Sequence, residues 1–74
     1  MEIEGKRIRR TRLIQTDNLV VAVEVDMVYP VDDPDEPCFE SEVVAFLKEV
    51  KTRAENQDLA WLKARGKIYS LVAI

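Results

Sequence analysis

One stretch decides the fold of this chain, and it reads LVVAVEVDMVY from Leu19 to Tyr29. Apolar side chains occupy every second position along it, at Leu19, Val21, Val23, Val25, Met27 and Tyr29. The other parity carries Glu24 and Asp26 among smaller apolar residues. A period of two with many β-branched residues predicts a strand that buries one face.

The residues before this stretch predict its partner. Lys6 to Ile14 is a weaker strand, and Thr16-Asp17-Asn18 supplies turn residues, so the two strands form a hairpin. If Asp17 and Asn18 are the central turn residues, the numbers of facing residues sum to 35. That register sets Arg9 opposite Asp26, which gives the hairpin complementary charge.

The first strand is also the candidate binding strand. Residues 1–12 hold five basic and two acidic residues, and the basic ones are Lys6, Arg7, Arg9, Arg10 and Arg12. Charges on an edge strand discourage aggregation, which is one interpretation of this set. The register above turns Arg10 and Arg12 toward the core. Either the register differs, or this strand is an edge that presents its arginines to a ligand or partner.

Acidic residues gather from the middle of the second strand to the start of the expected helix. Residues 24–42 hold eight acidic residues and no basic one, and Pro30 to Pro37 reads as a loop. The loop lacks the Gly and Glu spacing of an EF-hand, and its prolines limit how it could wrap a cation. We expect a solvated acidic loop and no metal site.

One long helix follows the loop. Ser41 is the expected N-cap, with Glu40 and Glu42 at the positive end of the helix dipole. The helical spacing predicts one apolar face, made of Val43, Val44, Phe46, Leu47, Val50 and Ala54.

A short second helix is expected next. Asp58 can cap it, it runs from Leu59 to Ala64, and Gly66 ends it. Trp61 lies off the face formed by Leu59 and Leu62, so we expect it at the core margin, with a partner contact as the alternative.

The last segment, 67–74, predicts a strand that is apolar on both parities. Such a strand is covered on both sides, and one helix covers only one face of a three-stranded sheet. A second copy of the chain is the simplest way to cover the remaining face of the sheet. Tyr69 joins Trp61 as a candidate partner contact.

Together these elements predict a single α+β domain over residues 1–74, in two layers and in the order β-β-α-(short α)-β. Strands 19–29 and 67–74 are expected to be neighbours that run parallel through a right-handed crossover, leaving the basic strand at an edge. The alternative places the first strand in the middle, antiparallel to both.

The residue inventory argues against catalysis. The chain has no histidine, one cysteine (Cys38) and two glycines, Gly5 and Gly66. It therefore lacks the commonest general base, a thiolate metal site and a phosphate-binding loop. We expect no enzyme, no catalytic residues, no cofactor and no metal.

The sequence favours a small non-enzymatic interaction module. We expect it to be homodimeric and cytoplasmic, to bind a protein partner and not to bind membranes, because no apolar run approaches about 18 residues and the start lacks a signal-peptide pattern. Nucleic-acid binding through the basic strand is the alternative. A net charge of −3 disfavours it.

Overall fold

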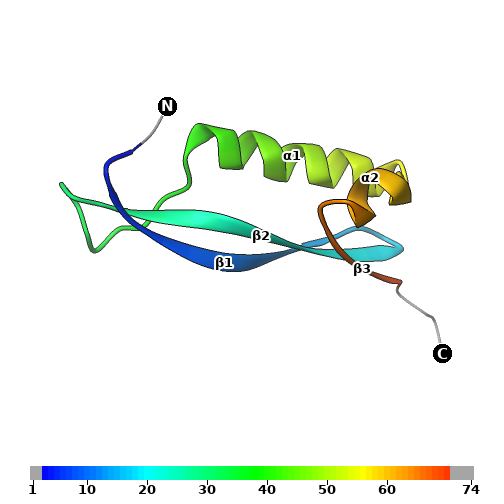
Figure 1. Ribbon diagram of the computed structural model, residues 1–74. Coiled ribbons are helices and arrows are strands. Elements are labelled where there is room, and N and C mark those ends of the chain that lie inside the picture. Colours follow the sequence, from blue (N-terminus) through cyan, green and yellow to red (C-terminus); the bar gives the residue numbers. More distant parts are fainter. Residues whose placement is uncertain (1–2, 71–74) are drawn as a thin grey trace.

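The computed structural model describes residues 3–70, and it is an α+β fold with the predicted order of elements (Figure 1). Its elements are β1 (Gly5–Gln15), β2 (Leu19–Pro30), α1 (Ser41–Glu55), α2 (Leu59–Lys63) and β3 (Gly66–Ser70). The helices form one layer and the three-stranded sheet forms the other. The predicted continuation of the last strand over 71–74 lies outside the described residues.

The hairpin register is the predicted one. Arg9 pairs with Asp26 and Thr11 with Glu24, so facing residues sum to 35 along the whole ladder. The strand order β1-β2-β3 leaves the basic strand at an edge, as expected. The alternative order, with the first strand in the middle, is wrong.

The direction of β3 corrects the prediction. β3 neighbours β2, but it runs antiparallel to it, with Gly66 opposite Val23 and Ser70 opposite Leu19. α1 carries the chain back toward the hairpin turn, and α2 then reverses it, so β3 starts at the middle of β2 and runs toward the turn (Figure 1). The expected parallel crossover is therefore absent from the described residues.

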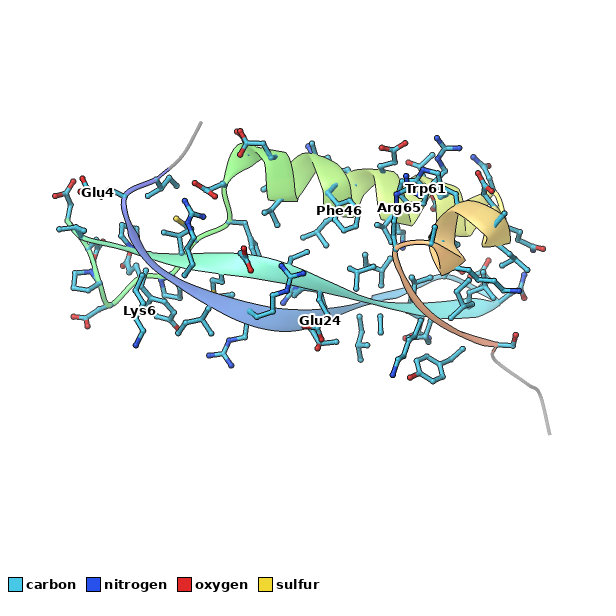
Figure 2. The ribbon with its side chains drawn as sticks, viewed as in Figure 1. Glu4, Lys6, Glu24, Phe46, Trp61 and Arg65 are labelled. Carbon is cyan, nitrogen blue, oxygen red and sulfur yellow. The ribbon has the colours of Figure 1, made fainter. Side chains whose placement is uncertain are left out.

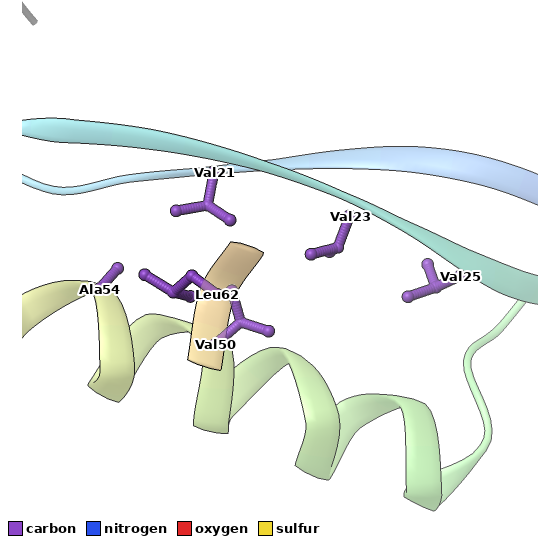
Figure 3. Close-up of a cluster of buried hydrophobic side chains, with 6 residues drawn as sticks. All are labelled: Val21, Val23, Val25, Val50, Ala54 and Leu62. Atoms are coloured by element: carbon purple, nitrogen blue, oxygen red, sulfur yellow. The ribbon is translucent and has the colours of Figure 1, made fainter. Parts of the chain in front are cut away.

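The core lies between β2 and the helices. It joins three valines of β2 to two residues of α1 and one of α2, and these are Val21, Val23, Val25, Val50, Ala54 and Leu62 (Figure 3). The predicted helix stripe is correct except at Val44, which is 39% exposed. The 100° step of an α-helix turns Val44 away from the line through Val43, Leu47 and Val50.

The hairpin twists strongly enough to change which face is buried. Val25 and Val28 have opposite parity on β2, yet they are 4% and 0% exposed. Near the hairpin turn the Val25 face meets the helices, whereas the Val28 face is covered at the far end, where Val28 bridges to Cys38. Two-stranded ribbons have the largest twist among sheets, so the buried face of β2 changes from one end of the hairpin to the other.

The helix starts show one correction and one confirmation. Ser41 was expected to cap α1, but Glu40 holds the N-cap position and makes no capping hydrogen bond, because its carboxylate bonds elsewhere. Asp58 caps α2 as predicted, accepting a hydrogen bond from the backbone N–H of Trp61 at 3.4 Å. No helix within residues 3–70 is both long and apolar enough to cross a membrane.

Candidate functional site

Arg7, the second basic residue of β1, forms hydrogen bonds and an ion pair with Glu40. One guanidinium nitrogen of Arg7 donates to Oε1 of Glu40, the other donates to Oε2 at 2.8 Å, and the backbone N–H of Ile3 donates to the same carboxylate. These bonds lower the pKa of Glu40 from its ordinary value of 4.5 to about 2. Arg7 thus joins the N-terminal segment and β1 to the start of α1.

Arg9 is paired across the hairpin. Its Nη1 lies 3.0 Å from Oδ1 of Asp26, and its Nε lies 3.9 Å from Oε2 of Glu24. The hydroxyl of Thr11 donates to Glu24 at 2.8 Å, on the sheet face that points away from the helices (Figure 2). Arg9 and Glu24 are exposed to solvent and Asp26 is half-buried, so this cluster contributes little to stability.

The other three basic residues share the opposite parity. Arg12 is an exposed residue that lies over the ring of Phe39, with its guanidinium carbon 5.5 Å from the ring centroid. The predicted core-side position of Arg12 is confirmed, because Arg12 pairs with the buried Val23 of β2. Lys6 and Arg10 are exposed and have no ion pair within residues 3–70.

Trp61 is a half-buried packing residue. Arg65 lies over its ring at 4.1 Å and Arg53 at 5.1 Å, and the ring of Phe46 is 6.3 Å away (Figure 2). The carboxylates of Glu49 and Asp58 in turn hold Arg53 and raise its pKa. Trp61 thus occupies the core margin, as predicted, with two cations over its ring.

Tyr69 belongs to an exposed apolar surface that sequence reasoning missed. Tyr69 faces Val20 across β2 and β3, and Leu13 faces Ala22 across β1 and β2. These four residues share the sheet face opposite the helices, and we call them the apolar patch. Leu13 is 67% exposed and Tyr69 53%. The register that sums to 35 already placed Leu13 opposite Ala22, and this pairing was the available signal.

The described surface also has a hollow at each end of the hairpin. A polar hollow of about 530 Å³ lies between the hairpin turn and the end of α1, where Lys51 donates to the carbonyl of Gln15 at 3.0 Å. An apolar cleft of about 410 Å³ lies at the opposite end, and it is lined by Lys6, Ile8, Tyr29, Pro30, Val31 and Pro34. Within residues 3–70, no group of three potential metal ligands comes together.

No family model, no curated protein and no solved structure matches this chain. The described surfaces are therefore the guide to what this chain can bind. The structure brings Leu13 and Tyr69 onto one sheet face that no other described element covers, and it does not bring the basic strand together with the second candidate set, Trp61 and Tyr69. The described surfaces offer an exposed apolar face and an outermost strand, β1.

Proposed function

We propose that this chain is a small non-enzymatic interaction module that acts as a homodimer through the apolar patch. The observation that carries the proposal is the uncovered sheet face, on which Leu13 and Tyr69 are 67% and 53% exposed. Large apolar side chains that adjoin one another on a surface mark interaction sites, whereas isolated ones do not.

The surroundings of the apolar patch support this proposal. Arg9, Glu24 and Lys67 lie on the same sheet face, so a polar rim of both charges borders the apolar centre. A stable interface buries about 800 Å² on each partner, which requires this rim as well as the four central residues.

A second copy is the favoured cover because a two-fold axis joins identical patches. The rim carries Arg9 together with the acids Glu24 and Asp26, so two identical faces do not set one sign of charge against itself. Nucleic-acid binding has less support from this geometry. Arg7 and Arg9 are already ion-paired within the chain, which removes two of the five candidate phosphate contacts.

The solution mass tests the homodimer. We expect multi-angle light scattering to give the mass of two chains at micromolar concentrations, and the mass of one chain for Leu13→Lys and Tyr69→Lys. Each substitution places a charge in the centre of the apolar patch, where it would be buried without a partner.

Val44→Lys is the matched control, because Val44 is an exposed apolar residue on α1, in the other layer. It should leave the dimer intact. A wild-type chain that stays monomeric at every concentration would refute the proposal, and so would a dimer that survives both patch substitutions.

A further inference from the structure

β1 has an outer edge that no described strand pairs with. The sheet order places β1 outermost. At one end of the hairpin the N–H of Thr16 donates to the carbonyl of Leu19, and at the other the N–H of Val31 donates to the carbonyl of Glu4. Even-numbered residues of the first strand therefore bond to β2.

The odd-numbered residues accordingly direct their backbone groups outward. Arg7, Arg9, Thr11 and Leu13 present alternating N–H and C=O groups along this edge, within an eleven-residue strand. A long unpaired edge is a ready template for another strand.

The positive charge along the outer edge of β1 determines which kind of strand can pair with it. Lys6 and Arg10 have the same parity, are exposed, and have no ion pair within the described part of the chain. They stand beside the open edge and would lie next to the side chains of an added strand. Acidic residues in that strand would form cross-strand ion pairs with them.

We propose that the outer edge of β1 binds an acidic, extended segment of another protein, which adds to the sheet as a fourth strand. Main-chain hydrogen bonds supply affinity in this mode of recognition, and alternate side chains supply specificity. The inference rests on the proposed role as an interaction module, but it does not require the homodimer.

Other occupants fit the edge less well. A second β1 would set basic residues against basic residues. The chain's own acidic loop contains Pro34 and Pro37, which cannot donate to a ladder. Phosphate oxygens accept hydrogen bonds, so a nucleic-acid backbone could use the N–H groups of the edge but not its C=O groups.

The test uses a short synthetic peptide of alternating Glu and Val, titrated into the full-length chain and followed by backbone amide NMR shifts. We expect the largest shifts at the odd-numbered β1 residues. A peptide of alternating Lys and Val should not bind, and Arg10→Glu should weaken binding more than Lys48→Glu, which makes the same charge change on α1.

Thr11→Pro separates strand addition from charge attraction. It removes an outward N–H without touching the β1–β2 ladder, where an edge strand tolerates proline. Thr11→Val is its control, since it loses the same hydroxyl contact to Glu24 and keeps the N–H. We expect Thr11→Pro to weaken peptide binding by about tenfold or more, and Thr11→Val by about twofold at most.

Three results would overturn the inference. They are an absence of peptide binding, peptide binding that Thr11→Pro leaves unchanged, and binding of a thymidine oligonucleotide in preference to the peptide. If Thr11→Pro fails to fold, the wild-type amide shifts provide the test: the largest shifts at odd-numbered β1 residues support strand addition, and the largest shifts elsewhere refute it. The Tyr69→Lys monomer should still bind the peptide, because Tyr69 lies on β3, away from the outer edge of β1, so failure of the homodimer and failure of this edge are distinguishable.

Discussion

Glu40 shows how one residue joins three parts of the molecule. It is the buried charged residue of the described chain, at 8% exposure, and it accepts hydrogen bonds from Arg7 and from the backbone of Ile3. A buried carboxylate needs such partners, because an unpaired one would be costly. The bidentate pair also explains why the side chain of Glu40 does not cap α1.

Glu40→Gln should therefore change how stability responds to acid. The pKa of Glu40 is about 2 in the folded chain and 4.5 ordinarily, so its contribution is complete above about pH 4.5 and is lost as the pH falls through about 2. We expect the wild type to be more stable than Glu40→Gln near neutral pH, with the difference vanishing near pH 2. Urea unfolding across this range measures it.

Glu55→Gln is the control, since Glu55 is exposed and no hydrogen bond or ion pair engages its side chain in the described residues. It should unfold like the wild type. A stability difference between Glu40→Gln and the wild type that persists unchanged at pH 2 would contradict the role given to Glu40.

At the scale of elements, α1 ends in a Schellman motif built without glycine. The N–H of Gln57 donates to the carbonyl of Ala54 at 3.1 Å, and that of Asp58 donates to Arg53 at 2.9 Å. Gln57 has a φ of 54°, the left-handed conformation that disfavours side chains with a Cβ. The turn at Gln57 directs the chain into α2. α2 reverses the chain direction before β3, which runs antiparallel to β2.

Gln57→Gly should stabilise the fold. Glycine adopts this φ without a steric penalty, so we expect the free energy of unfolding to rise by about 1 kcal/mol. Asn56→Gly is the control, because Asn56 has an ordinary φ of −87° and glycine there only adds flexibility to the unfolded chain. Chemical denaturation compares the two, and equal effects of both substitutions would refute the argument.

The whole molecule is long and thin. It measures 47 × 24 × 17 Å, and its radius of gyration is 14.2 Å, against about 11 Å for a compact domain of this length. One helix layer on one sheet leaves much surface exposed, including the apolar patch. A chain of this size has a small core, and a second copy would add burial that the monomer lacks.

If the homodimer is the stable form, its unfolding should depend on concentration. We expect the thermal midpoint of the wild type to rise as the protein concentration rises, since dissociation accompanies unfolding. Leu13→Lys should unfold at a midpoint that does not change with concentration. A wild-type midpoint that is equally insensitive to concentration would argue that folding and dimerisation are uncoupled.

Sequence alone determined the elements and the hairpin. The alternation in Leu19 to Tyr29, the Asp17-Asn18 turn and the Asp58 cap are local signals, and each specifies its own neighbourhood. They predicted the register and Trp61 at the core margin, whereas the edge position of the basic strand was predicted from a parallel crossover that the structure does not have. The basic candidates, Lys6 and Arg10 among them, were chosen from residue type, and their role in binding stays a prediction.

Tertiary structure decided the direction of β3, the burial of Val28 and the pairing of Arg7 with Glu40. The direction of β3 depends on how α2 packs through Leu62, and the other two depend on twist accumulated along the hairpin. These contacts join residues far apart in the chain, so no local pattern encodes them. The apolar patch has the same origin, because three strands must first be set in register before Leu13 and Tyr69 share one uncovered face.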